Sequence, residues 1–108
     1  RSLREATQGD LQAAWASPDG QRVAALRAVL DKAVSGAYGE QVAARATKVK
    51  ARMEGLPAAL RSDVQAAIEL PKDQRRAAFK DIRAKVKAGQ YGELKHPLRP
   101  FRFLHQRG

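Results

Sequence analysis

The segment Gly36-Ala37-Tyr38-Gly39-Glu40 occurs again 53 residues later as Gly89-Gln90-Tyr91-Gly92-Glu93. The match extends toward the N-terminus without a gap, so residues 3–40 align with residues 56–93, and sixteen of the 38 aligned positions are identical. Self-similarity at a fixed period of this size is typical of helical repeat proteins. We therefore expect two tandem copies of a helical unit.

The residues of the repeated segment suit the junction between two helices. Its first glycine can take the left-handed conformation that ends a helix. Its tyrosine stands where an apolar residue packs at the start of the next helix, and its glutamate falls in that helix's first turn, where the helix dipole favours an acid. These structural roles account for Tyr38 and Tyr91 better than direct contact with a ligand does.

Apolar residues at helical spacing predict helices in both copies. We expect them at about residues 3–16, 17–35 and 40–54 in the first copy, and at about 57–69 and 71–88 in the second. Ser17-Pro18-Asp19 is typical of a helix start, while Asp10 and Ser62 offer alternative starts for the first helix of each copy. Gly55 is expected to end the third helix.

The copies differ after Glu93, where Pro97 and Pro100 exclude a long helix. We expect residues 94–108 to form an extended basic tail that occupies the place of a third helix. The predicted fold is all-α: two copies, residues 1–53 and 54–93, packed with this tail into a single compact domain, as a small bundle or a solenoid segment.

The chain is strongly basic, with 21 Lys and Arg against 11 Asp and Glu, a formal net charge of +10. Such a balance favours polyanionic partners, although a basic surface can also serve solubility alone. The sharpest charge pattern lies in the predicted helix 71–88, where five cations follow each other at intervals of three or four residues and therefore share one narrow face. We call these five residues the cation stripe: Lys72, Arg76, Lys80, Arg83 and Lys87.

The cation stripe is not a requirement of the repeat. The aligned positions of the first copy hold Asp19, Val23, Arg27, Leu30 and Val34. A line of cations along a helix is typical of contact with a phosphate backbone, and a solvated charged face is the alternative.

The predicted tail adds a second candidate surface. Arg99 and Arg102 alternate with Phe101 and Phe103, a pattern that can neutralise phosphates and stack bases, or can dock its rings on the helices instead. Pro97-Leu98-Arg99-Pro100 also fits a PxxP docking segment, in which Pro97, Pro100, Phe101 and Phe103 would contact a protein partner.

Catalytic, metal and cofactor signatures are absent from the sequence. There is no cysteine, the two histidines His96 and His105 both fall in the tail, and no phosphate-binding glycine loop occurs. We predict no enzyme activity, no cofactor and no metal. No stretch is long and apolar enough for a membrane span, and without a signal peptide the cytoplasm is the default expectation. Because the chain begins at Arg1 rather than Met, we expect it to be part of a larger protein.

Arg1-Ser2-Leu3-Arg4 is similar to the R-x-L-R string of secreted oomycete effectors, which also contain small tandem helical units with a Trp and a Tyr. The likeness covers four residues, and no acidic-Arg segment follows it, so it does not assign the chain to that family. Two hypotheses follow from the whole sequence. The first is sequence-tolerant binding to DNA or RNA through the cation stripe, Arg99 and Arg102. The second is a protein-interaction module with an acidic partner, such as an adaptor, scaffold or secreted effector domain.

Overall fold

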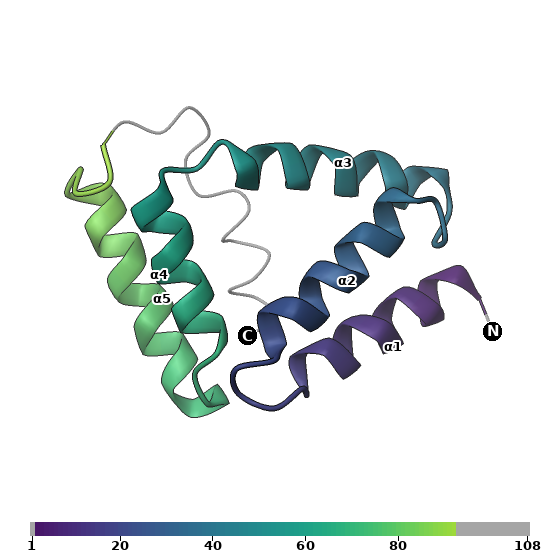
Figure 1. Ribbon diagram of the computed structural model, residues 1–108, viewed down its shortest axis with the longest axis horizontal. Helices are drawn as coiled ribbons and strands as arrows, with labels where there is room; N and C mark the ends of the chain where they lie inside the picture. Colours follow the sequence, from purple (N-terminus) through teal and green to yellow (C-terminus); the bar gives the residue numbers. More distant parts are fainter. Residues whose placement is uncertain (1, 93–108) are drawn as a thin grey trace. The chain divides into compact units, whose positions relative to one another are not determined.

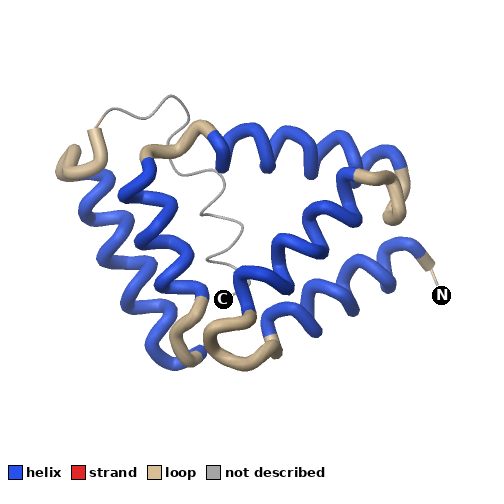
Figure 2. Tube along the Cα trace, viewed as in Figure 1, coloured by secondary structure: helices blue, strands red, loops and turns tan. Residues whose placement is uncertain are grey.

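The computed structural model describes residues 2–92, and these residues fold into five helices without a strand (Figures 1 and 2). The predicted all-α class is therefore confirmed. The helices are α1 (Leu3–Trp15), α2 (Arg22–Val34), α3 (Glu40–Glu54), α4 (Ala58–Ile68) and α5 (Lys72–Lys87). Within the described residues the core is formed by helix-on-helix packing, as expected for a chain rich in alanine.

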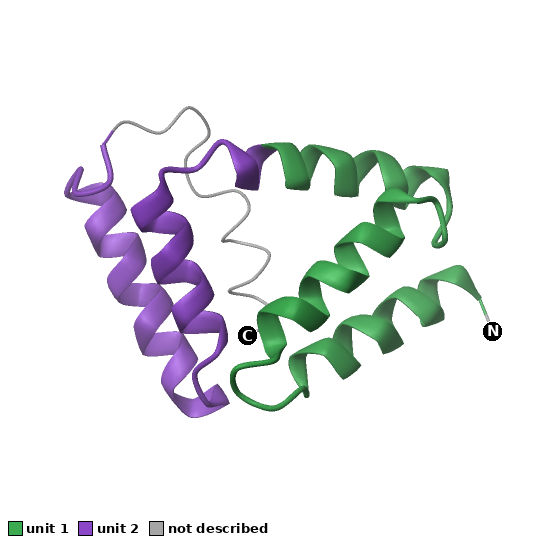
Figure 3. Cartoon of the chain, in the orientation of Figure 1, with its two compact units in different colours: residues 1–51 green, residues 52–108 purple. Residues whose placement is uncertain are grey.

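The chain divides into two compact units, Arg1–Ala51 and Arg52–Gly108 (Figure 3). In the first unit α1 packs on α2, and in the second α4 packs on α5. The predicted arrangement of segments 1–53, 54–93 and 94–108 in one compact domain stays a prediction, and the tail lies outside the described residues.

Helix α1 begins at Leu3 because Ser2 caps it. The Ser2 Oγ accepts a hydrogen bond from the Glu5 backbone N–H at 3.1 Å, which satisfies one of the free donors of the first turn. The helix then runs through Gly9-Asp10 without a break. The alternative start at Asp10 is therefore wrong, and so is the alternative start at Ser62, because α4 already begins at Ala58 after Pro57.

The predicted start of the second helix at Ser17-Pro18 is also wrong. Helix α2 begins only at Arg22, because Gly20 has a φ of 91°, which an α-helix cannot contain. The aligned position in the second unit is Asp73, and there α5 begins at Lys72, directly after Pro71. One residue thus decides how soon the second helix of each unit starts.

The core of the first unit lies where α1, α2 and α3 meet. Buried Ala33, Tyr38 and Ala46 form its centre, with partly buried apolar residues packed around them: Ala6, Val29, Leu30, Val34 and Val42. Ala46 brings α3 into this cluster, and Lys50 on α3 pairs with Asp31 on α2 at 3.5 Å. Helix α3 therefore contacts the C-terminal part of α2.

The second unit is a helical hairpin with larger core residues. Leu60 is fully buried, and five other apolar residues are nearly so: Val64, Ala67, Ile68, Phe79 and Ile82. Burying each of the larger side chains stabilises the fold by about 1.5–3 kcal/mol. These contacts fix the face that α5 turns toward α4, and hence the faces that it leaves to solvent.

Candidate nucleic-acid interface

All five residues of the cation stripe are exposed on α5. At 100° per residue they cover an arc of about 80°, and at 1.5 Å per residue they extend over about 22 Å of the helix. The buried positions of α5, Arg75, Phe79 and Ile82, occupy the neighbouring arc, which packs toward α4. The stripe is therefore a straight row of charges along one flank of the hairpin.

No stripe residue forms an ion pair with a described residue. Other cations of the chain do: Lys32 pairs with Asp10 at 3.1 Å, and Lys85, on the far flank of α5, lies 3.9 Å from Asp63. The charge of the stripe is thus left for a partner or for solvent. Helix α5 has two acids, Asp73 and Asp81. Both lie on the outer face of the helix, between the stripe and the flank that carries Lys85.

The flank that carries the stripe corresponds to the flank of α2 that contacts α3 in the first unit. In α2 this flank includes Leu30 and Val34, which pack against the core cluster, and Asp31, which pairs with Lys50. The aligned residues of α5 are Arg83, Lys87 and Ala84. At these three positions α5 therefore lacks the two apolar side chains and the acid that α2 has.

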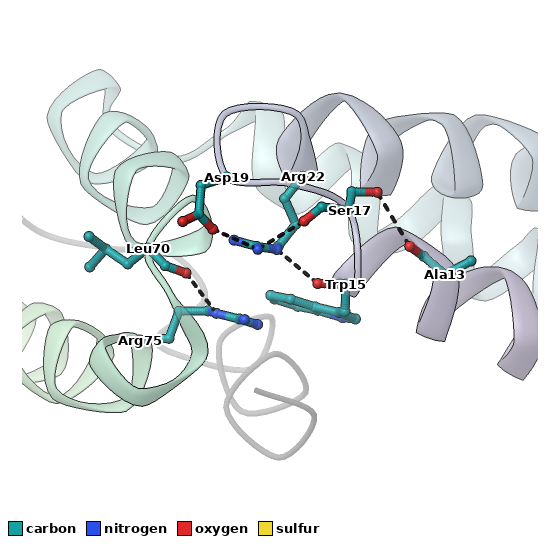
Figure 4. A network of polar contacts seen from close by, with 7 residues as sticks. All are labelled: Ala13, Trp15, Ser17, Asp19, Arg22, Leu70 and Arg75. Atoms are coloured by element: carbon teal, nitrogen blue, oxygen red, sulfur yellow. Dashed lines mark hydrogen bonds and ion pairs between the residues drawn. The ribbon is translucent and has the colours of Figure 1, made fainter.

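Two buried arginines, Arg75 on α5 and Arg22 at the aligned position of α2, do not belong to this surface (Figure 4). Arg75, next to the stripe residue Arg76, is 5% exposed, and its Nε donates to the Leu70 carbonyl oxygen at 3.1 Å. Arg22 donates to the carbonyl oxygens of Trp15 and Ser17, both at 2.9 Å, and pairs with Asp19. Each guanidinium group thus fixes the turn that precedes its helix by hydrogen bonds to carbonyl oxygens.

Sequence reasoning missed the structural role of these arginines, although a signal was present. Arg22 and Arg75 occupy aligned positions, and each donates to the carbonyl oxygen five residues before it. An identical arginine among variable charged residues indicates a fixed geometric role. Neither cation can therefore be counted toward a surface that binds a polyanion.

A second recurring contact joins the tyrosine of the repeated segment to an acid 28 residues earlier. Tyr38 donates a hydrogen bond to the Asp10 carboxylate, and Tyr91 donates to Asp63 Oδ2 at 2.6 Å. Burial, together with the hydrogen bond to Asp63 and its negative charge, raises the pKa of Tyr91 to about 12. Lys32 lies over the Tyr38 ring, 5.4 Å from its centre. Asp10 was predicted as a possible helix start, and that prediction is wrong: Asp10 and Asp63 both lie inside helices and accept a hydrogen bond from tyrosine.

The tail residues of the predicted sites lie outside the described residues. This applies to Arg99 and Arg102 of the nucleic-acid hypothesis, and to Pro97, Pro100, Phe101 and Phe103 of the protein-partner hypothesis. The structure thus brings together the five residues of the cation stripe alone among the predicted site residues.

Neither a metal site nor a membrane span is found in residues 2–92. Those residues contain no group of three or more His, Cys, Asp or Glu side chains that could hold a metal ion. In the same range no helix has the length and the apolar character needed to cross a bilayer.

Comparisons of the chain with protein-family models, with curated proteins and with solved structures found no match. Its function has therefore to be inferred from its own residues.

Proposed function

We propose that this chain is a basic helical module that binds the phosphate backbone of nucleic acid through the cation stripe, with Arg99 and Arg102 of the tail as further contacts. The observation that carries the proposal is that five exposed cations share one flank of α5, and that none pairs with a described acid. A protein gains affinity for nucleic acid by releasing one set of counterions for each phosphate that it neutralises.

The stripe also lowers the stability of α5 through repulsion between like charges, and the packing of the hairpin does not require these charges. Its members form four like-charge neighbours at spacings of three or four residues, and each such pair destabilises a helix by about 0.2–0.5 kcal/mol. At the aligned positions of the first unit, Leu30 and Val34 pack against the core cluster, while Asp19 and Arg27 are exposed. A charged flank that lowers helix stability is better explained by an anionic partner than by packing.

The repeat itself belongs to the proposal. We infer that residues 3–40 and 56–93 are two copies of one unit whose shared residues serve the fold, and whose differences serve binding. The aligned contacts of Tyr38 with Asp10 and of Tyr91 with Asp63 support this inference.

The test is a charge reversal with a matched control. Arg76→Glu, Lys80→Glu and Arg83→Glu remove the centre of the stripe, while Arg27→Glu, Arg45→Glu and Lys48→Glu change the net charge equally in the first unit, where all three residues are exposed. We expect the unchanged chain to bind mixed-sequence DNA and RNA with an affinity that falls steeply as salt rises. The stripe variant should lose this binding, the control should retain most of it, and circular dichroism should show both folded.

Three results would contradict the proposal: no binding at low salt, an affinity independent of salt, or an equal loss in both triple variants. An acidic protein surface is the alternative partner. It would be supported by a partner that remains bound to the chain after nuclease treatment and is released by the stripe reversal.

A further inference from the structure

Among the described residues, the surface around the cation stripe offers no exposed aromatic ring for stacking bases. Residues 2–92 contain four aromatic side chains, and none is exposed: Tyr38 and Phe79 are buried, while Trp15 and Tyr91 are half-buried. Proteins that hold single strands stack successive bases on exposed aromatic rings, which contribute about 1–3 kcal/mol per base. In the described part of the chain that source of affinity for a single strand is absent.

The stripe is also a rigid element. Helix α5 contains neither Gly nor Pro, and Arg75, Phe79 and Ile82 anchor it in the hairpin. A rigid row of charges suits a duplex, because the positions of the duplex phosphates are also fixed over the length of the stripe. A flexible single strand would first have to be ordered along that row, at a cost in conformational entropy.

The acids of α5 define how a duplex could approach. Asp73 lies beside the stripe on the outer face of the helix and Asp81 lies further round, both exposed. If α5 entered a groove, phosphates on both sides would face the helix, and these carboxylates would be repelled. Contact with one backbone through the stripe alone keeps Asp81 away from the phosphates and leaves the base edges unread.

We propose that the stripe is a docking surface for duplex nucleic acid, which it contacts along one strand's backbone from outside the grooves. This rests on the proposed function and deepens it by naming the form of nucleic acid. The higher charge density of a duplex adds to the preference, because the affinity changes with the logarithm of salt concentration by about −0.9 per phosphate contact for a duplex and about −0.7 for a single strand.

The experiment measures binding of the full chain to a short mixed-sequence DNA duplex and to one of its strands alone, by fluorescence anisotropy across a salt series. The five stripe contacts contribute slopes of about −4.5 for the duplex and about −3.5 for the strand. With equal affinities at ~1 M salt, this difference makes duplex binding about twentyfold tighter at ~0.05 M salt. Changing Arg76, Lys80 and Arg83 to Gln should reduce the duplex slope by about 2.7. In a Phe101→Ala, Phe103→Ala variant the duplex affinity should stay within about twofold, because the stripe supplies no stacking contact to lose.

The outcomes separate the two proposals. Binding of neither DNA at low salt would contradict the proposed function itself. A single strand bound as tightly as the duplex, with both affinities lowered by the Gln substitutions, would overturn the duplex preference and leave backbone binding in place. Loss of duplex binding in the phenylalanine variant, equal to the loss in the Gln variant, would also overturn it, because the binding would then depend on aromatic rings.

Discussion

Tyr91 has a structural role, and its ionisable phenol group is partly buried beside the Asp63 carboxylate. The sequence predicted a packing role for it and for Tyr38, because both lie in the repeated segment, whose tyrosine stands at the junction between two helices in the first copy. The hydrogen bonds to Asp63 and Asp10 could not be predicted in the same way, because a spacing of 28 residues has no meaning within one helix. Only the hairpin brings these side chains together.

The raised pKa of Tyr91 predicts a stability change at alkaline pH. The folded pKa, about 12, lies above the ordinary value of 10.0, so the contact with Asp63 stabilises the fold below pH 10 and loses that effect as pH rises toward 12. The wild-type chain should therefore be more stable than Tyr91→Phe at pH 9, and the difference should shrink at higher pH. Urea unfolding of both proteins at several pH values measures this, and the shared lysines cancel in the comparison. A difference that stays constant up to pH 12 would show that the phenol does not titrate as the contact requires.

Arg75 and Arg76 show the limit of sequence reasoning at the level of single residues. The two arginines are adjacent, yet one is buried on a carbonyl oxygen and the other is exposed in the stripe. The helical period separates them by 100°, which assigns Arg76 to the stripe and Arg75 to the face of Phe79 and Ile82. Its identity with Arg22 was a second signal, because the other charges of α5 mostly differ from those of α2.

At the scale of helices, the ends of elements were harder to predict than their existence. All five helices follow from apolar periodicity, and α5 matches the predicted helix 71–88 once its flanking residues Pro71 and Ala88 are included. The start of α2 was wrong because Ser17-Pro18 is a good helix signal that Gly20 overrides. A local signal of this kind holds only if the following residues also adopt helical angles.

Helix α5 should become more stable when the stripe is partly neutralised. Arg76→Gln together with Arg83→Gln removes all four like-charge neighbours and one opposite-charge neighbour, Asp73, at little change in helix propensity. The double change should stabilise the second unit by about 0.6–1.5 kcal/mol at low salt. The gain should vanish near ~1 M salt, where charges are screened beyond about 3 Å. Urea unfolding at both salt concentrations is the measurement. Arg61→Gln on α4 is the control, because Arg61 is exposed and has no charged residue three or four positions away.

A stabilising effect confined to low salt, combined with weaker nucleic-acid binding by the same variant, would show that the stripe lowers stability while it provides affinity. If the double variant is instead less stable at every salt concentration, Arg76 and Arg83 have packing roles, and the reasoning from like-charge repulsion fails.

At the scale of the whole molecule, the distribution of charge is more informative than its total. A net charge of +10 alone predicts non-specific attraction to any polyanion. In the structure Arg22 and Arg75 are buried and therefore not available to a polyanion. Lys32, Lys50 and Lys85 each form an ion pair with an acid. The sequence could predict the stripe from its period, but it could not predict which of the other cations are available.

Nucleic-acid binding could depend on the total charge or on the position of the stripe. Moving charge from one unit to the other at constant net charge distinguishes these two explanations. The variant carries Arg76→Gln and Arg83→Gln in the stripe, with Gln12→Lys and Gln41→Lys at exposed positions of the first unit, so the net charge remains +10. If position decides binding, the slope of log affinity against log salt for duplex DNA should become shallower by about 1.8, and the affinity should weaken accordingly. The chain with only Gln12→Lys and Gln41→Lys is the control and should bind at least as tightly as the original. An unchanged affinity in the charge-relocated variant would mean that total charge governs binding, and that the alignment of cations on α5 has no part in it.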